Sequence, residues 1–450
     1  MPSSLSSDQF RSMLHVVQSR AANHDWQGAI AHTDELLSLL QEAPPTDETF
    51  TWPAQAWLLK GNLIRDARAG NADECYEKAL ASLPEGLHRP EHLNLLANLW
   101  TNRGIARLDA STADDVQMAV NYFQKAIELR QGLPMNESPL YPWGLSAAWM
   151  NRADALMRLD AAKNRQQALD HYQEALKVLA AMKPGDHPSL PARVALAWMN
   201  LGLLSAEGEQ ESKRSRQALD AAVQIAGTET TNGNQECRRV LIGALLARGG
   251  TVLPFDPSQS WQDAQDSLSL SSPLEQRELL AAEASIKARH LLCQVVTRKP
   301  SVVKEDWVTE TTDAVDDGMK LGRFWRQHGE KRLDLWGCEL FRFGLLVYQI
   351  WQPHFLAEFI LECIDPDVSE GAPVDNPAMH HLATEMIWRA VVALNKEAKA
   401  RNEGAEDAAR RDLLMQRLHD LQEAEQRLQV LRGKYNININ IKQTAAPATV

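Results

Sequence analysis

Three short stretches of the sequence decide the fold: residues 100–104 are Trp-Thr-Asn-Arg-Gly, residues 149–153 are Trp-Met-Asn-Arg-Ala, and residues 198–202 are Trp-Met-Asn-Leu-Gly. Each stretch begins 49 residues after the one before it. A proline stands ten residues before each of the three tryptophans, at Pro90, Pro139 and Pro188. So many matching offsets indicate an internal duplication.

A second pattern follows the first in each unit. It is Ala-x-x-x-aromatic-x-x-Ala, with Phe123 as the aromatic residue in one unit and Tyr172 in the next. Both patterns have helical spacing, and their small residues allow two antiparallel helices to approach closely. The tryptophan and the aromatic residue are expected to fill the space between neighbouring helix pairs. The sequence therefore predicts stacked α-hairpins, with each proline at the start of a hairpin.

These residues resemble the tetratricopeptide repeat, whose 34-residue pattern is tryptophan, glycine, aromatic, alanine, aromatic, alanine and proline. Weaker units precede the three copies, one around Trp26 over residues 8–41 and one around Trp57, and later units fade towards residue 270. The resemblance implies an all-α fold, a tetratricopeptide-repeat α-solenoid coiled into a right-handed superhelix over residues 8–270.

The linker between two units indicates which kind of repeat protein the chain resembles most. Residues 185–188 are Gly-Asp-His-Pro, which is similar to the linker of the kinesin light chain repeats, although the other linkers of this chain lack the full motif. Kinesin light chains connect motors to cargo. The sequence has no long N-terminal heptad repeat of the kind that joins such chains to a motor, so it resembles more closely the bacterial kinesin light chain-like proteins that associate with tubulin-like filaments.

The second half of the chain loses the 49-residue period. Residues 275–435 are expected to form an irregular C-terminal helical region that caps the solenoid, because they hold the most aromatic part of the sequence. Leucines stripe residues 414–431, which indicates either packing within the chain or pairing with a partner helix. Residues 436–450 are expected to be a flexible tail, and the alternative is a strand added to a partner's sheet.

Candidate binding residues lie at equivalent positions of the repeats. Asn102, Asn151 and Asn200 are expected to line the inner groove, where amides can hold the main chain of an extended peptide. The alternative is that each amide satisfies a local helix end or a neighbouring loop, and both remain open. Arg103 and Arg152 follow two of these asparagines and either flank an acidic ligand or meet an acidic neighbour, the latter being the more common arrangement.

Composition and motifs limit the class of function. Lysine and arginine number 47 against 59 acidic residues, a net charge of -12, which disfavours a nucleic-acid or anionic-membrane role. Five scattered cysteines and the absence of a signal sequence or long apolar run favour a cytoplasmic protein without a transmembrane segment. The sequence lacks phosphate-loop, dinucleotide, nucleophile-elbow and zinc-protease motifs, so we expect no catalytic residues, metal or cofactor.

The leading hypothesis is therefore a non-enzymatic scaffold that binds another protein. The resemblance makes a filament-forming tubulin-like protein the most specific partner. The alternative is an adaptor or sensor that captures a signalling peptide.

Overall fold

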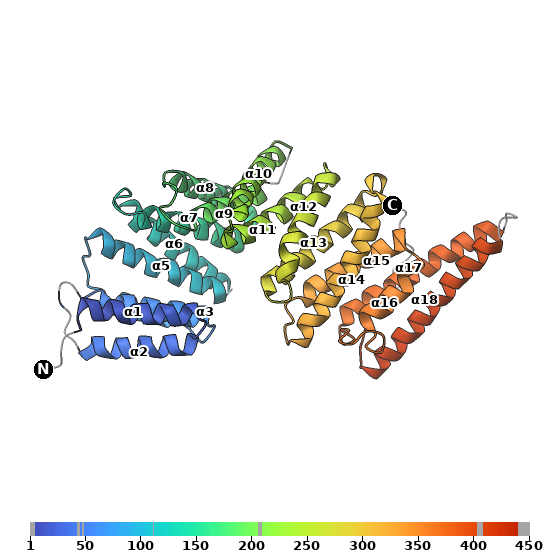
Figure 1. Ribbon diagram of the computed structural model, residues 1–450, viewed down its shortest axis with the longest axis horizontal. Helices are drawn as coiled ribbons and strands as arrows, with labels where there is room; N and C mark the ends of the chain where they lie inside the picture. Colours follow the sequence, from blue (N-terminus) through green and yellow to red (C-terminus); the bar gives the residue numbers. More distant parts are fainter. Residues whose placement is uncertain are drawn as a thin grey trace. The chain divides into compact units, whose positions relative to one another are not determined.

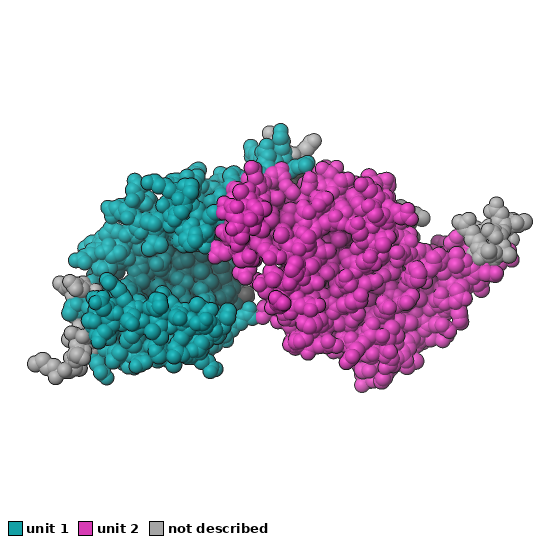
Figure 2. Space-filling model, in the orientation of Figure 1, with its two compact units in different colours: residues 1–218 teal, residues 219–450 magenta. Residues whose placement is uncertain are grey.

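The computed structural model describes residues 5–42, 46, 49–110, 112–205, 209–402 and 408–439, and it divides into two compact units, Met1–Ala218 and Leu219–Val450 (Figure 2). The described residues contain helices and no strand, so the predicted all-α class is confirmed. Each unit is described by itself below.

Unit 1 consists of consecutive antiparallel helices joined by short connections (Figure 1). They are α1 (Ser7–Ala22), α2 (Trp26–Glu42), α3 (Trp52–Asp66), α4 (Ala72–Ala81), α5 (Pro90–Ala110), α6 (Ala113–Gln131), α7 (Leu140–Leu159), α8 (Ala161–Ala180), α9 (Leu190–Leu204) and the first part of α10 (Glu209–Thr231). Every helix from α1 to α8 contacts the next one along the chain. This is the stacked-hairpin arrangement that the repeats predicted.

The first helices of successive hairpins also contact one another. Contacts join α3 to α5 and α5 to α7, so these three helices form a continuous layer, which we call the first-helix wall. Figure 2 shows unit 1 hollowed on the face turned towards the viewer. Hydrophobic side chains of unit 1 form several small clusters, each shared by neighbouring helices, as in a solenoid whose repeats touch only their neighbours.

Unit 2 packs differently, around one core. After the rest of α10 it contains α11 (Gln235–Val252), α12 (Pro257–Ser271), η1 (Ser272–Leu274), α13 (Leu279–Arg298), η2 (Pro300–Val302), α14 (Glu305–Gln327), α15 (Asp334–Trp351), α16 (Leu356–Ile364), α17 (Pro377–Asn402) and α18 (Ala408–Lys434). One hydrophobic cluster runs from Leu253 to Leu431 and includes four of the five α18 stripe leucines, Leu414, Leu421, Leu428 and Leu431. These leucines therefore pack within the chain. The predicted tail lies outside the described residues from residue 440 onwards.

Small residues on the first helices admit the aromatic rings of the second helices. A Cβ atom placed on Gly61 would lie 2.4 Å from the Tyr76 ring, and one on Gly104 would lie 2.6 Å from the Phe123 ring. Both rings are fully buried. The first-helix tryptophans are less buried than these rings, because Trp100, Trp149 and Trp198 are only half-buried.

Trp149 nevertheless fills space between neighbouring hairpins. Its ring packs against two hydrophobic clusters, one around Leu145 and Ile127 and the other around Tyr172 and Leu201. The wide indole covers the junction of two clusters while one edge stays in solvent, because a solenoid this thin has no deeper interior to enclose it.

We predict that Gly104→Ala lowers the free energy of unfolding by about 1 to 3 kcal/mol, because the new methyl group displaces the Phe123 ring. Gly250→Ala is the matched control. Gly250 lies inside α11 with no neighbouring atom within 4 Å of an added Cβ, so alanine there should raise stability by about 0.5 to 1 kcal/mol. Urea denaturation measures both, and equal effects of the two variants would contradict the close-packing account.

Candidate binding surface on unit 1

The three predicted asparagines occupy different environments, although all are half-buried. Asn102 on α5 accepts a hydrogen bond from Arg65 Nη1 of α3 at 3.0 Å and donates to the Asn98 carbonyl of its own helix at 2.9 Å. Asn200 on α9 donates to the Tyr172 hydroxyl at 3.0 Å. The side-chain amide of Asn151 on α7 makes no hydrogen bond with the described residues. Two of the three amides thus connect parts of unit 1, and the third has no hydrogen-bond partner among the described residues.

The Asn200 contact belongs to a buried polar cluster. The Tyr172 hydroxyl, which accepts from Asn200, donates in turn to the carboxylate of Asp154 on α7. Burial raises the pKa of Asp154 above its ordinary value, and burial together with the nearby carboxylate raises the pKa of Tyr172. Asn200 therefore joins α9 to the preceding hairpin and contributes to its packing.

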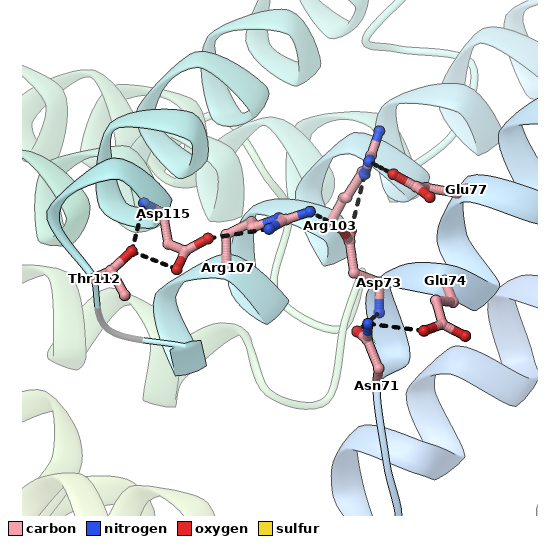
Figure 3. Close-up of polar contacts among 8 residues, drawn as sticks. All are labelled: Asn71, Asp73, Glu74, Glu77, Arg103, Arg107, Thr112 and Asp115. Carbon is pink, nitrogen blue, oxygen red and sulfur yellow. Dashed lines mark hydrogen bonds and ion pairs between the residues drawn. The ribbon is translucent and has the colours of Figure 1, made fainter.

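Arg103 extends from α5 into an ion-pair network with the neighbouring second helices α4 and α6 (Figure 3). Its guanidinium pairs with Asp73 at 2.8 Å and with Glu77, both on α4 of the preceding hairpin. Arg107 pairs with the same Asp73 and, at 3.0 Å, with Asp115 at the start of α6. The side chain of Asp73 is 8% exposed, so two cations compensate one buried carboxylate.

The two ends of this network are anchored by helix caps. Thr112 caps α6 by accepting from the Asp115 main chain, and its hydroxyl donates to the Asp115 carboxylate at 2.5 Å. The hydrogen bonds from Thr112 and Arg107 lower the pKa of Asp115. Asn71 caps α4 in a similar way by accepting from the Asp73 main chain. The network therefore connects the α3–α4 hairpin to the α5–α6 hairpin at helix ends that are already fixed.

The same cation position recurs in three units, and its ion pairing differs from unit to unit. Lys60, three residues after Trp57, pairs with Asp34 of α2 at 2.5 Å, just as Arg103, three residues after Trp100, pairs with α4. Arg152, three residues after Trp149, forms no ion pair with the described residues and donates instead to His171. Burial lowers the pKa of Arg152 and lowers that of His171 to about 4, so the imidazole is neutral at pH 7 and accepts this hydrogen bond.

The Gly-Asp-His-Pro linker has a structural role between α8 and α9. Gly185 adopts a positive φ of 92°, and the Asp186 carboxylate accepts a hydrogen bond from the Lys183 main chain at 2.8 Å. The ring of His187 stacks on Trp143 of α7 with centroids 3.6 Å apart, and the Arg193 guanidinium carbon lies 3.0 Å from the centroid of the same indole. The motif thus fixes the connection against the first-helix wall.

A group of polar residues that the 49-residue register did not single out lies along α5. Asn94, Asn98 and Asn102 follow one another at four-residue spacing, so they share one face of the helix. The oxygens of Asn94 and Asn98 face Arg130, and the oxygen of Asn102 faces Arg65. The four-residue spacing of these asparagines is visible in the sequence, and it is the signal from which this group could have been predicted.

The described residues contain no group of three or more histidine, cysteine, aspartate or glutamate side chains arranged to hold a metal ion. Among the helices with described residues, none combines the length and apolar composition needed to span a bilayer.

Comparisons with known proteins give no family for this chain. No family model matches the chain, and neither does any curated protein. Among solved structures, a Rap protein complexed with competence and sporulation factor is similar with a TM-score of 0.44 and 11% identity, over 96% of this chain and 99% of that chain. A circular tandem repeat protein with a novel repeat topology is similar with a TM-score of 0.24 and 12% identity, over 95% and 91%.

Neither match assigns a family or a function at these values, and neither structure is described as a kinesin light chain. The chain's own helices and repeated hairpins place it among the all-α helical-repeat proteins.

The pairing pattern predicts opposite stability effects for two equivalent arginines. Arg103→Leu should lower the free energy of unfolding by about 1 to 3 kcal/mol, because it removes a cation from the buried Asp73 carboxylate. Arg152→Leu should leave stability unchanged or raise it, because that guanidinium forms no ion pair with the described residues, Glu128 acts on it only from a distance, and the substitution removes a partly buried charge. Chemical denaturation measures the free energy of unfolding of both variants. An equal decrease in both would show that the ion pairs do not distinguish the two arginines.

Proposed function

We propose that this chain is a non-enzymatic helical-repeat scaffold that binds an extended segment of a protein partner along the first-helix wall of unit 1. Stacked hairpins support this proposal because they present one long surface built from equivalent helices. Such a surface contacts many residues of a partner at once without enclosing it.

The observation that carries the proposal is the side-chain amide of Asn151. It lies on α7, half-buried, with both donor and acceptor unused by the described residues. An amide in this state can accept from a peptide N–H and donate to a peptide C=O, which recognises main chain rather than side chains. Asn102 and Asn200 flank it on α5 and α9 and hold the neighbouring hairpins in place.

The role proposed for the arginines follows from their partners. Arg103 is engaged by two carboxylates and acts as a connection between hairpins. Arg152 retains a charge without an ion-pair partner, beside Trp149 and His171, and remains the arginine of this pair that is open to an acidic group of the partner.

A narrower version of the proposal names a filament of tubulin-like subunits as the partner. Its support is the resemblance of the repeats and of the Gly-Asp-His-Pro linker to kinesin light chains. Co-sedimentation of the purified chain with assembled filaments tests this version separately, and recovery of the chain in the supernatant at every filament concentration would exclude it.

Asn151→Ala should weaken partner binding by about 1 to 3 kcal/mol while leaving the unfolding midpoint almost unchanged, since no hydrogen bond of the described chain is lost. The partner is first recovered from native lysate by pull-down and identified by mass spectrometry, and its affinity is then measured by calorimetry. Asn121→Ala, on the exposed face of α6, is the matched control and should bind as the unaltered chain does.

If Asn151→Ala binds the identified partner at full strength, the partner does not use the first-helix wall at α7. If the variant instead loses stability with unchanged affinity, Asn151 has a structural role. Either result contradicts the proposed binding mode.

A further inference from the structure

One arginine of unit 1 is buried without any carboxylate partner. The side chain of Arg130, at the end of α6, is among the largest fully buried side chains of the described residues, and the residue is 1% exposed. Its guanidinium donates from Nη1 to Thr101 at 2.9 Å, from Nη2 to Asn98 at 2.5 Å, and from Nε to Asn94 at 3.5 Å. All three acceptors are uncharged and belong to α5.

The fold leaves space for this side chain. A Cβ atom on Gly144 of α7 would lie 2.5 Å from Arg130 Nε, so the absence of a side chain at Gly144 lets the guanidinium enter between α5 and α7. Burial lowers the pKa of Arg130 to about 10, and no carboxylate of the described residues offsets that effect. The guanidinium is therefore still charged at neutral pH, and its charge is not neutralised within the described chain.

A buried charge without a counter-charge is costly, and well-packed apolar residues often replace buried ions without loss of stability. Packing alone thus gives no reason for an arginine at this place. A group that brings negative charge to the adjacent surface does give one, because attraction between charges is strong where water is largely excluded.

Arg130 also fixes the direction of two amides on the first-helix wall. A guanidinium has only donors, so the amide oxygens of Asn94 and Asn98 must face it, and their NH₂ groups must point away. Neither NH₂ group donates to another described group, and neither nitrogen belongs to the buried unpaired polar atoms. Two oriented donor groups, one helical turn apart, therefore face outwards above a buried positive charge.

We propose that Asn94 and Asn98, backed by Arg130, form a carboxylate-binding site on α5. The carboxylate oxygens accept hydrogen bonds from the two NH₂ groups, and the buried guanidinium supplies the opposite charge. This inference rests on the proposed function, and it adds the chemistry of the partner: an extended peptide that carries an acidic side chain or a free C-terminus at this point.

Asn98→Asp is the sharpest test, because it is nearly isosteric. The new carboxylate still accepts from Arg130, so the hydrogen bond that holds α6 to α5 is kept, while the outward donor is lost and the buried charge is neutralised. Arg130 should lower the pKa of the new carboxyl, so any gain in stability should be present at pH 7 and disappear as the pH falls through the carboxyl pKa. Asn94→Asp provides a second variant should the first not fold, and Asn121→Asp on exposed α6 is the control for added charge.

The full chain is used to select binders from a phage library of random 12-residue peptides, and the selected peptides are then measured against each variant. The inference expects peptides enriched in aspartate, glutamate or a required free C-terminus. It also expects Asn98→Asp to bind them about 10- to 100-fold more weakly, while Asn121→Asp binds as the unaltered chain does. Resynthesis with glutamine or asparagine in place of the acidic residues, or with an amidated C-terminus, shows which carboxylate is bound.

Two results would overturn the inference, and they differ in what they leave standing. Selected peptides without acidic preference that bind the unaltered chain and Asn98→Asp equally well would remove the carboxylate site and leave peptide capture by the first-helix wall intact. A library that yields no binder for the unaltered chain would overturn peptide capture together with the site.

Discussion

The α3–α4 and α5–α6 hairpins of unit 1 depend on the contact between an aromatic ring on the second helix and a glycine on the first helix of the same hairpin. Tyr76 lies against Gly61 and Phe123 against Gly104, each so closely that a methyl group has no room. This contact sets the distance between the two helices and thereby the position of every side chain that leaves the first helix. From these positions, polar residues of the wall reach neighbouring hairpins, as Asn102 reaches Arg65.

The hydroxyl groups of these rings show how the polar and apolar parts of a hairpin are coordinated. Tyr76 donates to Asn62 at 2.9 Å, and Tyr172 donates to Asp154, each partner standing five residues after the first-helix tryptophan. In the hairpin between them the ring is Phe123, which needs no acceptor, and the residue at the corresponding position is Ile105. A buried hydroxyl requires a partner, so the two positions change together from repeat to repeat.

The fold could be predicted from the sequence because its determinants repeat at one interval. The tryptophans, small residues and aromatic residues of the 49-residue register describe hairpin packing directly, and the helices lie where that register places them. The candidate site was harder to predict from the sequence. Whether Asn102 or Asn200 is open to a ligand depends on Arg65 and on Tyr172, which come from other helices. The register marks Tyr172 as a packing aromatic but does not show which groups its hydroxyl bonds, and Arg65 is not part of the register.

The residues of the proposed carboxylate site illustrate the same limit. The four-residue spacing of the asparagines on α5 is visible in the sequence. The buried charge beside them is supplied by Arg130 of α6, and the absence of a side chain at Gly144 of α7 leaves room for it. Three helices must be in place before these residues form one site. Unit 2 has no such register, since its helices share a single core in which each contact is particular to one pair of elements.

Site-specific photo-crosslinking tests the central claim, that the first-helix wall is the surface that binds a partner. A photoreactive amino acid replaces Ala147, which lies half-buried on α7 one turn before Asn151, and in a separate variant it replaces Lys125, which is exposed on the second helix α6. The account predicts that the partner crosslinks from position 147 and not from position 125. Crosslinking from position 125 alone would place the partner on the second helices and contradict it.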